Sequence, residues 1–361
     1  MESRKRSVEG AMKMKSFRAV LQDNPVEASA PCRIDMGGTL DLSTFYLPLR
    51  HWEPCTFNAA INLRTRVRLH AFDKGRIKIS SRGFQGVVAD SGQAPYDHPL
   101  GLIIAIADYF AADGIHIEID SASPPRSALG GSSVAAVALI WAFGKLLQQL
   151  GHPMPGRREV ALLAHAIEQS VAGVPCGLQD QLAAVYGGVN NWHWQGKGGG
   201  AVFIREAVYP KRTCRQFSKQ IMVAYCGEPH ASKDINGTWV RDFMAGRHRR
   251  IWRQIIDCAR QFSEALRRKQ LSLAQSIMNR ETDLRCQMTP EVLDDIGGQL
   301  VDSARRRECG VRFTGAGGGG CMWAIGTPDQ LAVLRPDWQE ILARHSAAGI
   351  LETAIDVDGV L

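Results

Sequence analysis

The stretch PPRSALGGSSVAAVALIWAF, Pro124 to Phe143, places two glycines and two serines directly before a run of small and apolar residues. Glycine in a helix interior costs about 1 kcal/mol relative to alanine, so we expect Gly130 and Gly131 in a loop or a first helical turn. The serines favour a helix start, and the apolar run predicts a buried helix. Free N–H groups and the helix dipole at such a start suit a phosphate group. A serine-capped core helix behind a flexible turn is the alternative.

The length of 361 residues favours two domains with buried apolar cores. Residues 1–27 are basic without a central apolar segment, so we interpret them as an N-terminal arm and not as a secretory signal. No apolar run approaches the roughly 20 residues that span a bilayer. The nine cysteines form no CxxC pair, which favours free thiols in a reducing cytoplasm. We therefore expect a cytoplasmic protein without a membrane partner.

The formal net charge of +7 raises the question of a nucleic-acid partner. The basic runs GRHRRIWRQ, ALRRKQ and DSARRREC fall in helix-like segments of the second half and indicate solvated helix faces. Because no recognised nucleic-acid motif accompanies them, a nucleic-acid-binding module ranks last. A basic protein also suits an anionic small substrate, such as a nucleotide or a sugar phosphate.

Periodicity predicts α+β layers in both halves of the chain. Alternating apolar and polar residues predict strands, and apolar residues at helical spacing predict helices. The strand expected at 220–227 is a candidate edge of the first domain. From 232 the pattern turns helical, and a strand, a glycine loop, a strand, a helix at 329–347 and a closing strand at 350–357 follow. We expect domains at 28–230 and 231–361.

A second glycine run, Thr314 to Cys321, contains the pattern GxGxxG. Only about 40 residues follow it, too few for the rest of a dinucleotide-binding fold. We therefore interpret it as a tight loop whose backbone approaches a ligand or another loop. The chain has no Walker A sequence, so a nucleotide site here is of another kind.

Charged residues at two further places suit phosphoryl transfer. Glu168 and Asp180 are separated by a helix end and a loop broken by glycine and proline, which can bring them together. Phosphoryl transfer needs a carboxylate near the nucleophile and an acidic ligand for magnesium. Arg33 lies in a predicted strand, and Asp41 follows a Gly-Gly turn. The alternatives are an aspartate helix cap with an unrelated surface glutamate, and a strand followed by an ordinary turn.

Three segments in order resemble the GHMP kinase family: APCRIDMGGTLDL, PPRSALGGSSVAA and FTGAGGGGC. The stretch AGVPCGLQDQLAAVYGG is similar to the branch that phosphorylates sugars at the anomeric oxygen. The stretches RIDMGGTLDL, NAAINL, ALGGSS and HASKDIN resemble the bacterial heptose-7-phosphate kinases. The resemblance implies a two-domain α+β fold, with an N-terminal ATP-binding domain of mixed α/β structure and a C-terminal ferredoxin-like domain.

The resemblance also implies roles for individual residues, with ATP and Mg²⁺ as cofactors. Asp180 would be the catalytic base or orienting carboxylate, with Arg33 favouring its ionised form. Asp41 and Gly177 would bind the substrate, and Ser133 and Glu168 would hold magnesium. The residues expected at the ATP phosphates are Leu129, Gly130, Gly131, Ser132 and Ser133, supported by Gly315, Gly317 and Gly318 of the second domain.

Two departures from the family concern the substrate. Heptose kinases usually have three glycines before Thr-Asp, whereas this chain has Gly37, Gly38, Thr39, Leu40 and Asp41. The sugar-binding run Glu-His-Thr-Asp of galactokinases is absent, which argues against galactose. We predict a kinase for the anomeric hydroxyl of a sugar or sugar phosphate, most of all a heptose 7-phosphate. A mevalonate-type or homoserine-type kinase and a non-catalytic relative that binds ATP or sugar are the alternatives. The oligomeric state, a homodimer included, stays open.

Overall fold

The computed structural model describes residues 16–173, 175–195, 202–227 and 235–361. Two long strands, β1 (Val26–Met36) and β2 (Cys55–Ala71), pair antiparallel and form the spine of the first sheet. Strand β2 also pairs with two further strands: its first residues pair with β6 and its last residues pair with β5. Its first half is buried, whereas its second half alternates between buried and accessible positions, as expected for a sheet with one wet face.

The first sheet has seven strands in the order β4-β3-β5-β2-β6-β7, with β1 paired to β2. Only β3 and β5 run parallel among these pairs. The remaining elements of this N-terminal domain are α1 (Phe17–Asp23), α2 (Ser43–Leu49), β3 (Arg76–Ser81), β4 (Val87–Asp90), α3 (Gly101–Tyr109), β5 (Ile115–Ser121), α4 (Gly131–Gln149), α5 (Arg157–Val171), α6 (Gln179–Tyr186), β6 (Val189–Trp194), β7 (Phe203–Ala207) and α7 (Cys214–Ser218).

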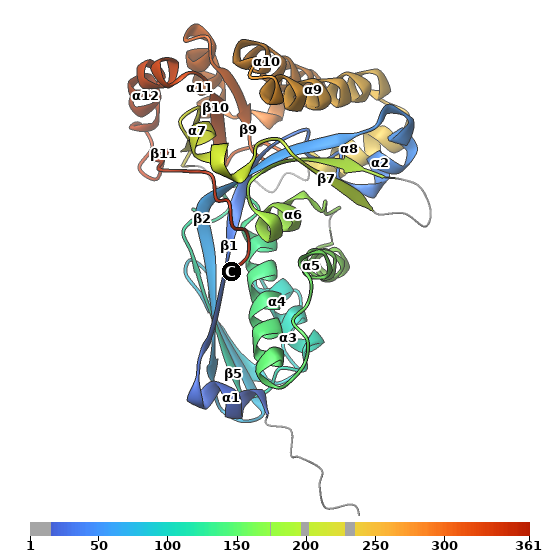
Figure 1. Ribbon diagram of the computed structural model, residues 1–361, viewed down its shortest axis with the longest axis vertical. Helices are drawn as coiled ribbons and strands as arrows, with labels where there is room; N and C mark the ends of the chain where they lie inside the picture. Colours follow the sequence, from blue (N-terminus) through green and yellow to red (C-terminus); the bar gives the residue numbers. More distant parts are fainter. Residues whose placement is uncertain (1–15, 174, 196–201, 228–234) are drawn as a thin grey trace, which may run out of the picture.

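Helix α4 is the central helix of this domain. It packs on β1 and β2, and α3, α5 and α6 pack beside it, all along the same face of the sheet (Figure 1). Small residues such as Ala135, Ala136 and Ala138 let it lie close to its neighbours. Among the described residues, α4 alone has the length and composition to cross a membrane, and 67% of that window is buried inside the protein. Its apolar character is therefore that of a core helix.

The C-terminal domain has a four-stranded antiparallel sheet in the order β11-β8-β10-β9. Its strands and the helices between them follow the β-α-β-β-α-β succession of a ferredoxin-like fold, which confirms that expectation. The elements are β8 (Ile221–Tyr225), α8 (Ile235–Met244), α9 (Arg249–Arg267), α10 (Leu271–Met288), α11 (Asp295–Arg306), β9 (Gly310–Phe313), β10 (Cys321–Ile325), α12 (Pro328–Leu342) and β11 (Gly349–Leu351).

The structure corrects three boundaries expected from the sequence. Residues 17–27, assigned to the arm, form α1 and the start of β1, and Val20 and Leu21 are buried. Strand β8 is an inner strand of the second sheet and not an edge of the first. The expected domain boundary at 230 lies outside the described residues. So does most of the stretch QGKGGG at 195–200, whose composition predicts a turn.

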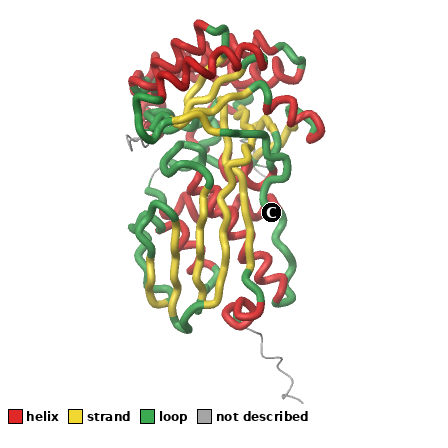
Figure 2. The backbone as a smooth tube through the Cα atoms, turned by 90° about the vertical axis from the view of Figure 1, so that its left-hand side faces the viewer, coloured by secondary structure: helices red, strands yellow, loops and turns green. Residues whose placement is uncertain are grey.

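The third correction concerns the closing strand, which is short. After β11 the chain returns to the N-terminal domain, where Ile355 forms a bridge with Ile61. Leu361 and Ser29 exchange two backbone hydrogen bonds, of 2.9 and 3.1 Å. The chain end therefore lies beside the long strands of the first sheet (Figure 1 and Figure 2). The last residues tie the two domains together.

Candidate active site

The first glycine loop ends at the N-terminus of α4. Gly130 is the residue before the helix and has a left-handed backbone (φ 80°), and no side chain caps the helix. Ser132 and Ser133 lie inside the first turn, so the serine-cap alternative is wrong. Because N–H groups of a first helical turn have no partner within the helix, this end of α4 can accept an anion.

Gly130 lies against Asp180, which comes from the start of α6. A Cβ atom on Gly130 would lie 2.9 Å from Asp180 Cγ, closer than such atoms approach. A Cβ on Gly131 would have its nearest neighbour, Ser123 Oγ, at 3.6 Å, an ordinary contact. The glycine that the local packing requires is therefore Gly130, and it brings the α4 N-terminus up to a carboxylate.

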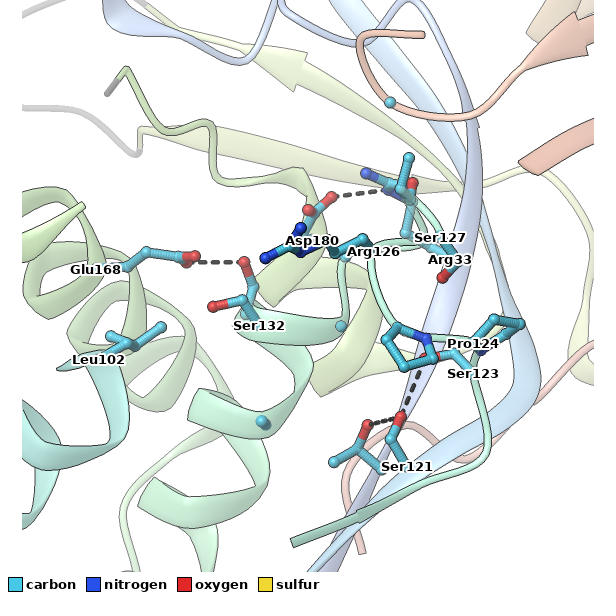
Figure 3. A pocket seen from close by; sticks show the side chains of 18 of the residues that line it. Arg33, Leu102, Ser121, Ser123, Pro124, Arg126, Ser127, Ser132, Glu168 and Asp180 are labelled. Atoms are coloured by element: carbon cyan, nitrogen blue, oxygen red, sulfur yellow. Dashed lines mark hydrogen bonds and ion pairs between the residues drawn. The ribbon is translucent and has the colours of Figure 1, made fainter. Parts of the chain in front are cut away.

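Asp180 is paired with Arg33 of β1. Arg33 Nε donates to Asp180 Oδ1 at 2.7 Å (Figure 3). Its Nη1 donates to the carbonyl oxygen of Ala128 at 2.7 Å. Burial lowers the pKa of Arg33, but the nearby charges of Asp180 and Asp35 raise it above its ordinary value. The guanidinium is thus a permanent charge that holds the Asp180 carboxylate at the edge of the loop.

The predicted magnesium residues lie together on α4 and α5. Ser133 Oγ donates to Glu168 Oε2 at 2.7 Å, and Gln181 Nε2 donates to the same oxygen at 2.6 Å. Burial raises the pKa of Glu168 to about 7, although the hydrogen bond from Ser133 lowers it. A buried carboxylate of this kind gains from a cation beside it, because the cation offsets the cost of burying its charge.

Asp41 and Gly177 also lie together, close to the start of α6. The N–H of Gln179 donates to Asp41 Oδ2 at 3.1 Å, and burial raises the pKa of Asp41 to about 6. A Cβ on Gly177 would come within 1.7 Å of Asp41 Oδ2. Gly177 is therefore needed for the close approach of its backbone to this carboxylate.

These groups line one cavity of about 670 Å³. Apolar residues of β5, α3 and the loops around them form one part of its wall, and the charged groups described above form another. Its polar lining includes Arg33, Thr39, Asp41, Ser132, Ser133, Glu168, Gln179, Asp180, Asn236 and the exposed Arg126. The cavity size fits a ligand of nucleotide dimensions with a second small molecule beside it.

The second glycine loop reaches this cavity with its first residues. Gly315 lines the cavity, and its N–H donates to Asp35 Oδ1 at 2.7 Å. Gly317 and Gly318 contact Val292 of their own domain: a Cβ on Gly317 would lie 2.5 Å from the Val292 carbonyl oxygen, and the Gly318 N–H donates to it at 2.8 Å. The structure thus places Gly317 and Gly318 behind the cavity wall.

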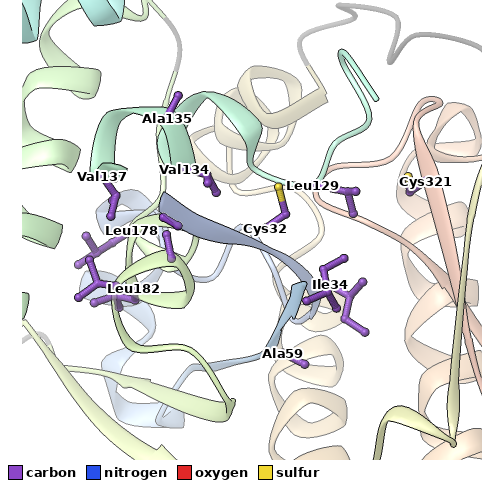
Figure 4. Packing of buried hydrophobic residues seen from close by; sticks show 14 of the residues in the cluster. Cys32, Ile34, Ala59, Leu129, Val134, Ala135, Val137, Leu178, Leu182 and Cys321 are labelled. Atoms are coloured by element: carbon purple, nitrogen blue, oxygen red, sulfur yellow. The ribbon is translucent and has the colours of Figure 1, made fainter. Parts of the chain in front are cut away.

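Leu129 also lies differently from what the sequence indicates. Its side chain is fully buried in the apolar cluster with Cys32, Ile34 and Val134 (Figure 4). Its carbonyl oxygen accepts from the N–H of Arg33 at 3.3 Å. Leu129 therefore anchors the loop to the core and to β1. The residues that follow it, and not Leu129, line the cavity.

A buried chain of charges lies behind Arg33, and sequence reasoning missed it. Asp35 lies 3.5 Å from Arg33 Nη1 and 3.2 Å from Arg312 Nη1. Arg312 pairs with Glu281 at 2.7 Å, and Glu281 pairs with Arg285 at 2.9 Å. The side chains of these four residues behind Arg33 are fully buried. They connect the part of β1 that contains Arg33 to β9 and α10 of the C-terminal domain.

Arg285, the last residue of this series of ion pairs, binds the loop that precedes Asp41. Arg285 Nη2 donates to the Gly38 carbonyl oxygen at 2.7 Å, and its guanidinium lies over the rings of Trp239 and Trp252. Residues of the second domain therefore help to hold in place both the Arg33–Asp180 ion pair and the loop before Asp41.

The central part of this chain matches a known protein family. Residues 98–188, which include the first glycine loop, match the family described as "GHMP kinases N terminal domain". The chain is 26% identical to mevalonate kinase from Pyrococcus horikoshii over 299 residues, which covers 74% of this chain and 81% of that protein. It is 45% identical to D-glycero-alpha-D-manno-heptose 7-phosphate kinase from Campylobacter jejuni over 67 residues, 19% of each chain.

A solved structure described as a D-glycero-D-manno-heptose 1-phosphate kinase from Bacteroides thetaiotaomicron has a TM-score of 0.70 and 19% identity to this chain. The match covers 93% of this chain and 97% of that one. Both domains therefore share the fold of that protein.

Proposed function

Because this chain carries the GHMP kinase N-terminal domain and has the two-domain fold of these kinases, we propose that it transfers the γ-phosphoryl group of ATP to a sugar hydroxyl. The observation that carries the proposal is the position of Asp180. Its carboxylate is paired with Arg33 and lies against Gly130 at the start of α4, in the cavity that Asp41 also lines. In this proposal the phosphate site and the acceptor site would adjoin at one carboxylate.

The phosphates of ATP would bind at the backbone of Gly130 to Ser133. The left-handed Gly130 turns the chain into α4 without a capping side chain, so the N–H groups of the first turn face the ligand. The apolar part of the cavity, with Leu102, Ile103 and Ile119, suits the uncharged base of the nucleotide.

The donors at Ser133 and Glu168 fit Mg²⁺. A hydroxyl and a carboxylate are hard oxygen ligands, and magnesium bound to ATP takes one or two such protein ligands besides phosphate and water. When bound, the ion would neutralise charge on the phosphates during transfer. Burial raises the pKa of Glu168 to about 7, and this carboxyl would have to be deprotonated to hold the cation.

Asp180 would act on the acceptor hydroxyl. The acceptor oxygen forms the new bond to the γ-phosphorus, the bond from that phosphorus to ADP breaks, and the hydroxyl proton passes to the Asp180 carboxylate. Arg33 holds this carboxylate in place through the 2.7 Å hydrogen bond and keeps a positive charge beside it. Positioning and charge stabilisation supply most of the catalysis in this class of reaction.

We propose the anomeric hydroxyl of a heptose 7-phosphate as the acceptor. The short segment that is 45% identical to the Campylobacter heptose 7-phosphate kinase supports this substrate. Asp41 supports a hydroxyl-rich molecule, because a buried carboxylate accepts hydrogen bonds from hydroxyls and repels an acceptor that carries its own carboxylate there. The longer likeness to mevalonate kinase favours mevalonate as the second candidate.

The test is magnesium-dependent ADP formation with heptose 7-phosphate, free hexoses, mevalonate and homoserine offered in parallel. We expect the highest kcat/KM with the heptose phosphate, and phosphorus NMR of the product should place the new phosphate on the anomeric carbon. A higher kcat/KM with mevalonate than with the sugars would show that mevalonate, the second candidate, is the acceptor. ATP binding without transfer to any of these acceptors would favour a non-catalytic relative.

A further inference from the structure

Thr39, between the Gly37-Gly38 turn and Asp41, has an unusual backbone. Its φ is +74°, in the left-handed region that favours glycine. Of the described non-glycine residues with positive φ, Thr39 is the only β-branched one. A branched Cβ is strained in this region, whereas glycine adopts it freely. The chain thus keeps a side chain at a position where a glycine would be more stable, and strain of this kind points to a functional contact.

The Thr39 hydroxyl forms a hydrogen bond with a residue of the C-terminal domain. Thr39 Oγ1 donates to Asn236 Oδ1 of α8 at 3.2 Å, although 197 residues separate the two in the chain. Both residues line the cavity that contains Asp41 and Asp180. Thr39 is 6% exposed, so its hydroxyl has a defined environment and is not a freely rotating surface group.

The hydrogen bond orients the Asn236 amide. With Oδ1 accepting from Thr39, the Nδ2 group donates to no residue that the structure describes. A threonine hydroxyl that donates one hydrogen bond can still accept another through its lone pairs. The pair therefore offers a donor and an acceptor to a ligand, next to the carboxylate of Asp41, and such a set is complementary to neighbouring hydroxyl groups.

We propose that Thr39 and Asn236 form a specificity-determining pair that recognises a hydroxyl of the acceptor other than the one that is phosphorylated. The inference rests on the proposed function and narrows the acceptor to molecules with several neighbouring hydroxyls. A hydroxyl both donates and accepts, so it satisfies Asn236 Nδ2 and Thr39 Oγ1 together. An acceptor that lacks this hydroxyl leaves the buried Thr39 hydroxyl and the partly buried Asn236 amide without that contact, which lowers the affinity for the acceptor.

The test separates specificity from structure through Thr39→Gly. This variant removes the strain and the hydroxyl together, so we expect the midpoint of thermal unfolding to stay or rise by about 2 °C. We expect KM for heptose 7-phosphate to rise about five- to tenfold, the worth of one hydrogen bond, with KM for ATP unchanged. A residue with only a structural role would not combine greater stability with weaker acceptor binding.

Three further variants complete the experiment. Thr39→Ser keeps the hydroxyl and should restore the acceptor KM to within twofold of the parent. Asn236→Ala should raise the acceptor KM as Thr39→Gly does. Lys269→Gly is the matched control, because Lys269 also has positive φ (58°) but is exposed and lies outside the cavity lining. It should keep the parent's kinetics.

The outcomes distinguish this inference from the proposed function. An active parent enzyme with an unchanged acceptor KM in Thr39→Gly and Asn236→Ala overturns the inference alone. A rise in KM that Thr39→Ser does not reverse also overturns it, since the methyl group and not the hydroxyl would then matter. A parent enzyme that phosphorylates none of heptose 7-phosphate, hexoses, mevalonate and homoserine overturns the proposed function and the inference together.

Discussion

Arg33 Nε lies 2.7 Å from Asp180 Oδ1, although 147 residues separate the two in the chain. The pair joins β1 to α6 beside Gly130, the residue before α4, and Arg33 also donates to the Ala128 carbonyl oxygen of the same loop. One arginine thus connects the carboxylate that we propose as catalytic to the loop that would hold the phosphates. A change at any of these three places is expected to affect the other two.

The two glycines of the first loop should respond differently to alanine. Gly130→Ala places a Cβ 2.9 Å from Asp180 Cγ on a left-handed backbone, so we expect a loss of about 1–3 kcal/mol in the free energy of unfolding. Gly131→Ala has room in the free protein and should leave stability unchanged or raise it by about 1 kcal/mol. Both methyl groups lie where the phosphates would approach, so calorimetry should show weaker ATP binding in both variants.

Chemical denaturation of the pair, measured side by side, checks this expectation. Equal destabilisation by the two substitutions would contradict the assignment of Gly130 as the glycine that the packing requires.

Glu168 should make the stability of the ligand-free protein depend on pH. Its pKa rises from 4.5 to about 7 on folding because the carboxyl is buried. The folded state therefore binds its proton more tightly than the unfolded state, so this group's contribution to stability is largest below pH 4.5 and is lost as the pH rises to about 7. The loss is roughly 3 kcal/mol, since one pKa unit corresponds to about 1.4 kcal/mol.

Glu168→Gln keeps the shape and removes the titration. The difference in unfolding free energy between variant and parent, measured by urea denaturation without Mg²⁺, should grow in favour of the variant from pH 4.5 to 7. Asp41, whose pKa is also raised, is present in both proteins and cancels in the comparison. A difference that stays constant over this range would contradict the buried state of Glu168.

The sequence predicts the parts of the site that follow from local chemistry. Glycines, serines and an apolar run indicate a loop and a helix at Gly130 to Phe143, and the structure has both. Alternation of apolar and polar residues predicts strands at 60–72, 75–84 and 115–124. The structure has β2, β3 and β5 at these places, although β2 starts earlier. These features depend on residues that are close together in the sequence, so the local pattern of residue types predicts them.

The features that sequence reasoning missed depend on distant partners. All five residues of β8 are buried, so no alternation indicates which sheet it joins. Asp35 stands in a motif that drew attention to Arg33, but its partner Arg312 lies 277 residues away. Left-handed Thr39 has no signal of its own, because threonine rarely adopts this backbone. Only the folded arrangement shows these contacts.

The buried charges behind Arg33 should be highly sensitive to the loss of one partner. Glu281→Ala leaves Arg285 and Arg312 buried without their carboxylate, so we expect a loss of about 3–5 kcal/mol in the free energy of unfolding. Asp337→Ala removes the partner of Arg307 on the surface and should cost at most about 1 kcal/mol. Thermal and urea denaturation of the two variants measure the contrast, and similar small losses would contradict a structural role for Glu281.

The central claim is that Asp180 acts on the acceptor hydroxyl, and Asp180→Asn tests it most directly. The substitution keeps the shape but removes the charge and basicity that orient the hydroxyl and take its proton. Single-turnover transfer from labelled ATP to heptose 7-phosphate should fall by about 10²-fold or more, the usual contribution of general base catalysis. Calorimetry on the same variant should show ATP affinity close to that of the parent. Transfer at the parent rate would contradict the role assigned to Asp180.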